Sequence, residues 1–398
     1  MKKATAFQFF FIAAVPFVMV LGNSMLIPVF PQMEQAMNIS QFQVGLIITF
    51  FSLPAGIIIP FAGFLSDQYG RKIIIVPALF LYGIGGLISG TAALLLSQPY
   101  TILLVGRVVQ GIGAGGTYQL AMALTGDIFQ TDERTKALGL LEAANGLGKV
   151  VSPITGAAIA LIIWYAPFFL YGVLAFPIAL GVWFFVTEPK REHEKESIGT
   201  YWHKLVGVFS KKASLLLASY FVGMVALFTL FGVLSWVSDI LETDHNIFRF
   251  AKGLVLAIPV ASMAITSYIS GTVLSKRKTL WKPAIVGGIT LSTVTLVLIP
   301  LFTNIYLLMT VLLFLGMGIG LLLPPINTFI TGATGADKRG VVTSLYGTVR
   351  FFGVAMGPPA FGLAIQFGRL PMFIGATIIT TLAAVVAFFF ITPQKEDA

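Results

Sequence analysis

The stretch that decides the fold is FQVGLIITFFSLPAGIIIPFAGFLSDQYGRK, residues 42–72. Residues 42–64 are predominantly apolar and carry no charge, and about 20 such residues suffice to cross the hydrocarbon core of a bilayer as a helix. The polar end, from Gly63 to Lys72, then carries turn residues and charges. The stretch therefore predicts a membrane-spanning helix followed by a short polar connection.

The same pattern recurs along the whole chain. Of its 398 residues, 57% are hydrophobic and only 10% are charged, with a mean hydropathy of +0.92, whereas soluble domains are about one quarter charged. The sequence predicts an all-α membrane protein with twelve transmembrane helices. The predicted spans are residues 7–30, 42–64, 73–96, 100–126, 137–162, 167–187, 213–238, 251–274, 283–302, 305–331, 341–367 and 370–391.

The charged residues predict the orientation of these helices. Most of the 25 Lys and Arg residues fall in loops on the side of the N-terminus, which predicts an inner-membrane protein with both termini in the cytoplasm. The first apolar run is too long for a signal peptide, so we expect it to be retained. The basic residues form brief clusters between spans, which argues against nucleic-acid binding, and the absence of cysteine with three scattered histidines predicts no metal site.

A polar segment and an internal repeat divide the chain. Residues 188–212 predict a cytoplasmic central loop between an N-terminal bundle, 1–187, and a C-terminal bundle, 213–398. A shift of 205 residues superimposes the two bundles at glycine, arginine and proline positions: Gly111, Gly113, Gly115, Arg134, Gly148 and Pro153 correspond to Gly316, Gly318, Gly320, Arg339, Gly353 and Pro358. Such repeats predict two pseudo-symmetric six-helix bundles with a solute site between them.

The loop after the second span carries a recognisable signature. Gly63, Asp67, Gly70, Arg71 and Lys72 match G-x-L-x-D-x-x-G-R-[RK] at every defining position. This resembles the signature loop of the major facilitator superfamily, and the resemblance implies the major facilitator fold and a loop that gates alternating access. The alternative is an ordinary basic loop with a stray acid.

Two further spans extend the resemblance. In span four, Arg107, Gln110 and Gly111 are similar to the second motif of the family, which implies a role for Arg107 in proton coupling; alternatively, Arg107 only binds backbone carbonyls. In span five, Gly148, Pro153 and Gly156 resemble the Gly-Pro motif of the twelve-helix drug:proton antiporters, although Ser152 and Ala157 replace glycines. The resemblance therefore implies proton-driven multidrug efflux.

An acidic residue, Glu142, lies clearly inside span five. Glu142 is the candidate for proton coupling, because a carboxyl in a low dielectric alternates between neutral and ionised forms. Asn145 and Lys149 lie on the same helical face, and Arg350 occupies the repeat position of Asn145. The alternative is a static ion pair of Glu142 with Lys149 or Arg350.

The buried charges also bear on the solute. Arg107, Lys149 and Arg350 outnumber Glu142, so an anionic or zwitterionic solute would offset an otherwise expensive excess of positive charge. Further candidates for the substrate cavity, each of which has helix packing as its alternative role, are Asn23, Gln110, Tyr118, Gln119, Asn327 and Tyr346.

Together these features predict a secondary active transporter that exports amphipathic drugs or metabolites by proton antiport. The alternative is a dedicated carrier of an anionic metabolite, siderophore or lipid headgroup that uses Lys149 and Arg350; a transport-dead sensor or a membrane enzyme is a remote one. No phosphate-binding loop is present, so we expect the proton gradient to be the energy source, with no cofactor. The expected partners are a small solute, protons and membrane lipid, and the expected state is a monomer.

Overall fold

The computed structural model describes residues 3–129, 131–189, 198–274, 277–332 and 336–391. Its α-helices are α1 (Lys3–Ser24), α2 (Phe30–Met37), α3 (Gln41–Tyr69), α4 (Arg71–Leu95), α5 (Tyr100–Gly115), α6 (Tyr118–Ile128), α7 (Thr131–Ile159), α8 (Ala166–Phe185), α9 (Ile198–Thr243), α10 (Arg249–Leu274), α11 (Trp281–Leu298), α12 (Ile305–Gly332), α13 (Ala336–Ala364) and α14 (Arg369–Phe390). Short 3₁₀ turns are η1 (Ile27–Val29), η2 (Lys278–Leu280), η3 (Ile299–Leu301) and η4 (Ile365–Phe367).

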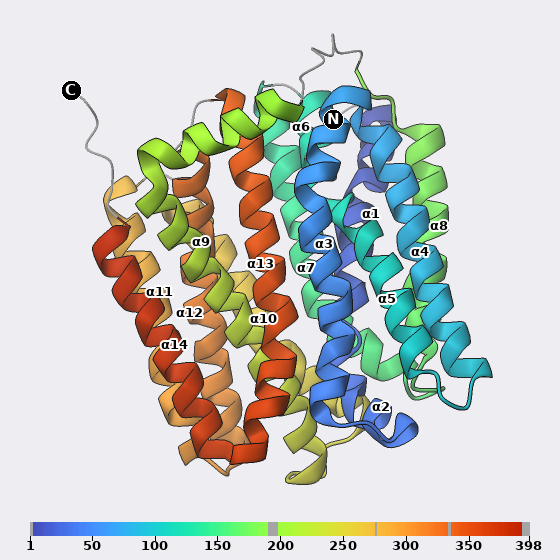
Figure 1. Ribbon diagram of the computed structural model, residues 1–398, viewed down its shortest axis with the longest axis vertical. Helices are drawn as coiled ribbons and strands as arrows, with labels where there is room; N and C mark the ends of the chain where they lie inside the picture. Colours follow the sequence, from blue (N-terminus) through green and yellow to red (C-terminus); the bar gives the residue numbers. More distant parts are fainter. Residues whose placement is uncertain (1–2, 130, 190–197, 275–276, 333–335, 392–398) are drawn as a thin grey trace.

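The long helices stand side by side, and α1 begins at the same end of the bundle at which α14 finishes (Figure 1). We call this the terminal end, and the opposite end, where α2 lies, the distal end. Among the described residues, ten helical segments are long and apolar enough to cross a membrane. Helices suit the hydrocarbon core of a membrane because they satisfy the backbone hydrogen bonds within one segment.

The two remaining predicted spans depart from a simple apolar helix. Span four is divided into α5 and α6 at Gly116 and Thr117, where the backbone makes tight turns to Gly113 and Ala114. Span five is α7, a continuous helix of 29 residues whose polar side chains lower its hydropathy. At 1.5 Å per residue α7 is still long enough to cross a bilayer, so the described residues account for twelve helical crossings.

The repeat seen in the sequence is also a repeat of packing contacts. A Cβ added at Gly111 would lie 2.2 Å from the carbonyl oxygen of Phe51 on α3, and one added at Gly316 would lie 2.1 Å from that of Pro259 on α10. Since α3 and α10 are the second spans of their respective halves, the matched glycines let equivalent helices approach backbone to backbone.

The central loop differs from the sequence-based expectation. The prediction of a loop through residue 212 is wrong from Ile198 onward, because α9 begins there and its first part runs across the terminal end before the helix descends (Figure 1). The apolar residues Trp202, Leu205 and Phe209 recur at intervals of three and four, which is the spacing of an amphipathic helix. Residues 190–197 of the predicted loop lie outside the described residues.

The two halves, α1–α8 and α9–α14, are in close contact at the distal end. The Ser238 hydroxyl donates a hydrogen bond of 2.6 Å to the Ile27 carbonyl oxygen, which joins α9 to η1. On α3 and α13, a Cβ added at Gly45 would lie 2.5 Å from the Pro359 nitrogen. The helices of the two halves are therefore tightly packed against each other at this end.

Candidate functional site

The predicted polar face of α7 takes part in a cluster of charges that spans both halves of the protein. Lys149 lies close enough to Glu142 on its own helix and to Arg350 on α13 to interact electrostatically with both. Tyr118, at the start of α6, interacts with the same acid and the same arginine. The structure therefore brings together Tyr118, Glu142, Lys149 and Arg350, which the sequence had placed in three separate spans.

Glu142 is held by a tyrosine rather than by a cation. The Tyr118 hydroxyl donates a short hydrogen bond to the Glu142 carboxylate, and Glu142 is exposed although it lies well inside α7. In the described part of the chain, Glu142 forms no ion pair with Lys149 or Arg350. The static ion pair considered from the sequence is therefore not formed here, and the carboxylate is accessible.

The second half contributes polar groups whose hydrogen-bonding capacity is unused. The Arg350 guanidinium lies 5.5 Å from the Tyr346 ring centre, in a cation–π contact. The Arg350 Nε and the Tyr346 hydroxyl are both buried, and neither has a hydrogen-bond partner among the described residues. Buried polar groups are normally paired, so these two are suited to receive polar atoms of a bound solute.

The other cavity candidates lie on three different helices. Asn145 is buried on α7, and Asn327 is exposed on α12. Gln119 reaches across to the second half, because a Cβ added at Gly347 of α13 would lie 2.3 Å from its Nε2. Their roles as substrate contacts stay predictions.

Arg107 belongs to a separate network in the first half. Its guanidinium is fully buried and donates to the carbonyl oxygens of Gly22 and Ile47, at 2.8 and 3.0 Å, and to the side-chain oxygens of Asn23 and Gln110, at 2.5 and 2.6 Å. These oxygens come from α1, α3 and α5. The structure thus favours helix docking for Arg107, Asn23 and Gln110, and it does not place them with Glu142.

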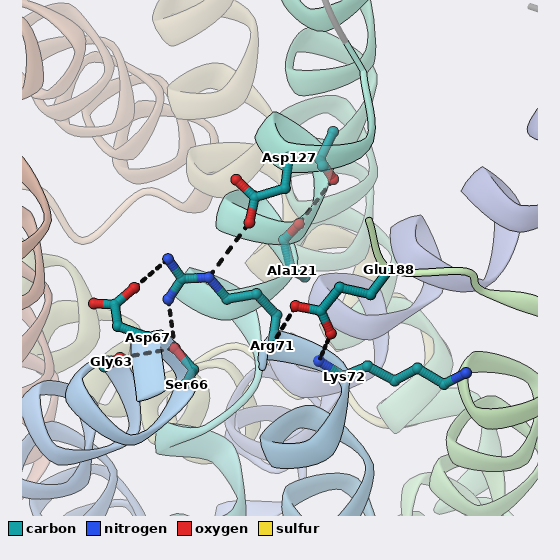
Figure 2. Close-up of polar contacts among 9 residues, drawn as sticks. Gly63, Ser66, Asp67, Arg71, Lys72, Ala121, Asp127 and Glu188 are labelled. Carbon is teal, nitrogen blue, oxygen red and sulfur yellow. Dashed lines mark hydrogen bonds and ion pairs between the residues drawn. The ribbon is translucent and has the colours of Figure 1, made fainter. Parts of the chain in front are cut away.

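The signature loop forms a compact polar network at the terminal end (Figure 2). Arg71 is ion-paired with Asp67, and its Nε lies 3.6 Å from Asp127 Oδ2 at the end of α6. Gly70 has a φ of 103°, a conformation that suits glycine at the tight turn between α3 and α4. The network joins two defining residues of the signature loop, Asp67 and Arg71; the gating role of the loop stays a prediction.

Two acids in this network were not anticipated. Glu188, after α8, accepts hydrogen bonds from the backbone N–H groups of Arg71 and Lys72, at 2.7 and 2.9 Å (Figure 2). Asp127 is the other. Both lie where a span meets the terminal end, next to basic loops, and that position was the available signal in the sequence.

The motif in span five supports close packing between helices. A Cβ added at Gly156 would lie 2.1 Å from the Met25 carbonyl oxygen, and one added at Gly148 would lie 3.2 Å from that of Phe17. Pro153 presents its carbonyl to Gly253 of α10, where an added Cβ would lie 2.6 Å away. The motif therefore docks α7 on α1 and on the second half.

Comparisons with known proteins agree with this architecture. The chain is 36% identical over 388 residues to the "Bacillibactin exporter" of Bacillus subtilis, covering 97% of this chain and 96% of that protein. It is 26% identical to "Multidrug resistance protein 2" of the same organism, with 96% and 94% covered. A bacterial homologue of the human lysosomal transporter Spinster, solved in an inward-facing and occupied conformation, matches over the full length of both chains with a TM-score of 0.80 at 15% identity.

The family model described as Major Facilitator Superfamily matches residues 12–358 and 282–398. The match confirms the major facilitator fold that was predicted from the sequence. The chain belongs to the major facilitator superfamily of membrane transporters.

Proposed function

We propose that this protein is a proton-coupled exporter of an acidic amphipathic solute, with its terminal end in the cytoplasm of a bacterial inner membrane. The observation that carries the proposal is the mixed cluster of Glu142, Lys149 and Arg350. The cluster combines an accessible acid of the first half, Glu142, with one cation from each half, Lys149 from the first and Arg350 from the second. The lopsided distribution of Lys and Arg supports the orientation.

Glu142 is suited to exchange a proton for a solute. Its carboxylate is exposed, and its hydrogen bond comes from Tyr118 and not from a cation, so it can be protonated without breaking an ion pair. Even when Glu142 is ionised, Lys149 and Arg350 leave one excess positive charge, which an anionic solute offsets. The proton gradient serves as the energy source, without a cofactor, and the protein acts as a carrier.

The chemistry of the second half supports an acidic solute. Arg350 offers an unused Nε, and Tyr346 offers an unused hydroxyl, which together suit a carboxylate or a phenolate oxygen. The relative named for the export of bacillibactin favours a siderophore as the solute. Broad multidrug efflux is the second candidate, favoured by the 26% identity to a multidrug resistance protein.

The test is transport by purified protein in proteoliposomes. An imposed pH gradient should drive flux, and Glu142→Gln should abolish gradient-driven flux while leaving solute exchange without a gradient intact. Binding should depend on an acidic group in the ligand and should be lost in Lys149→Ala. Lys136→Ala removes an exposed cation from the same helix and serves as the control. Flux that ignores the gradient would refute the coupling, and equal binding of neutral analogues would refute the substrate class.

A further inference from the structure

A group of charged side chains joins the two halves at the distal end, far from the cluster around Glu142. Glu34 comes from α2 of the first half, whereas Asp239 and Glu242 of α9 and Lys252 of α10 come from the second. Lys252 is fully buried and forms an ion pair with Glu242, whose side chain is 9% exposed. We call these four residues the distal cluster.

Hydrogen bonds across the interface surround the distal cluster. Gln32 Nε2 donates to Glu242 Oε1 over 3.4 Å, linking α2 to α9. One turn earlier on α9, Ser238 donates to the Ile27 carbonyl oxygen over 2.6 Å. Opening the distal end requires the two halves to separate here, so both hydrogen bonds must break.

The charges of the distal cluster do not balance. Glu34 interacts electrostatically with Asp239, Glu242 and Lys252, so three carboxylates face one ammonium group. Lys252 is already engaged by Glu242 of its own half. Glu34 Oε1 is buried and accepts no hydrogen bond from the part of the chain that the structure describes. When both are ionised, Glu34 and Asp239 therefore place like charges on opposite sides of the interface, which disfavours its closure.

The neighbouring charges leave this imbalance in place. Asp244, which follows α9, adds a negative charge beside Asp239 and interacts in turn with Arg369 of α14. His245 follows Asp244 in the same loop. The side chain of Arg249, at the start of α10, lies outside the described residues. Glu34, Asp239 and Glu242 also line a cavity of about 280 Å³, which gives protons and water a place beside the carboxylates.

We propose that the distal cluster is a proton-sensitive latch between the two halves. A proton on Glu34 or Asp239 removes the repulsion across the interface and allows one carboxyl to donate a hydrogen bond to the other. The distal end then closes. Loss of that proton restores two facing carboxylates and favours separation of the halves.

The latch supports exchange transport in one direction. With the orientation proposed above, the distal end faces the outside, where the proton concentration is high in a respiring cell. Protonation after the solute has left closes the exit and returns the carrier to the cytoplasm-facing state. The latch is distinct from Glu142, which carries the proton that is exchanged for the solute.

The distance between the distal ends of the halves tests the proposal. The chain has no cysteine, so Ser97→Cys and Thr303→Cys, in exposed loops outside the cavity, accept a pair of spin labels. Pulsed electron spin resonance should show the closed population rising by about fivefold relative to the open one between about pH 8 and about pH 5.5. Glu34→Gln, which mimics the protonated acid, should remain closed at both pH values.

Further variants separate the latch from transport coupling and from folding. Asp239→Asn should reproduce Glu34→Gln from the other half of the interface. Glu142→Gln should keep the full pH response of the label distance even though gradient-driven flux is lost. A wild-type distance that ignores pH, or a pH response retained in both Glu34→Gln and Asp239→Asn, would overturn the latch while leaving proton antiport at Glu142 untouched.

Discussion

The Tyr118 hydroxyl donates its hydrogen bond to the Glu142 carboxylate, and Tyr118 is the first residue of α6, directly after the break that divides span four. The proposed proton-binding acid is therefore attached to an interrupted helix. An interrupted helix adjusts more easily than a continuous one, because the regular helical hydrogen bonds give way here to the tight turns at Gly116 and Thr117. A change in the charge of Glu142 is thus positioned to move α6 relative to α7.

Replacing Tyr118 by Phe should weaken coupling without removing the acid. The variant keeps the aromatic ring and loses the hydroxyl that holds the Glu142 carboxylate. We expect gradient-driven flux in proteoliposomes to fall by about fivefold, which corresponds to one hydrogen bond of ~1 kcal/mol. Exchange in the absence of a gradient should stay near the wild-type rate. Unaltered gradient-driven flux would show that the hydrogen bond has no part in coupling.

Replacing Arg107 should damage folding before it damages coupling. The guanidinium donates to the Gly22 carbonyl oxygen near the end of α1 and to the side-chain oxygens of Asn23 and Gln110, and an alanine leaves these acceptors without that donor in a dry interior. Each unpaired acceptor costs about 1–3 kcal/mol. We expect Arg107→Ala to lower the thermal unfolding temperature strongly in detergent. Arg107→Lys should recover only part of it, because an ammonium lacks the planar fork. A stable Arg107→Ala protein that has lost proton coupling would instead support the role implied by the family motif.

The repeated glycines should respond alike to substitution. Gly111→Leu and Gly316→Leu each drive a side chain into a backbone carbonyl of the adjacent second span, so both should lose folded protein to a similar extent. Gly287 provides the control, since an added Cβ meets no atom within 4 Å there. Size-exclusion profiles of the three variants check this. Equal tolerance of all three substitutions would contradict the packing role of the repeat.

Much of the fold was predictable because a bilayer imposes a simple rule. Apolar runs such as residues 42–64 must form helices. The matching positions of the glycines indicated that the two halves are repeats of each other. The same rule gave a wrong prediction, a loop, for residues 198–212. Polar residues alternate there with Trp202 and Phe209, and an average of the hydropathy does not detect the helix that they form.

The proximity of site residues was predictable where they lie on one helix, and less predictable where they lie on different helices. Glu142 and Lys149 share a face of α7, so their proximity followed from helical periodicity. The proximity of Arg350 followed from the repeat. The buried environment of Arg107 and the acids of the distal cluster depend on contacts between spans far apart in sequence, which hydropathy and spacing do not encode.

Glu188 links the signature loop to the end of the first half, and its replacement should loosen that connection. Its two carboxylate oxygens accept from the N–H groups of Arg71 and Lys72, where α4 begins and its first amides lack partners within the helix. A carboxylate at this position also interacts favourably with the helix dipole, and the loss of such a cap costs about 1 kcal/mol. Glu188→Ala should therefore increase hydrogen exchange of these two amides by about fivefold, whereas Thr187→Ala, an exposed neighbour, should leave it unchanged. The contacts of Arg71 with Asp67 and Asp127 do not involve Glu188, so unchanged exchange in Glu188→Ala would mean that these other contacts hold the turn in place.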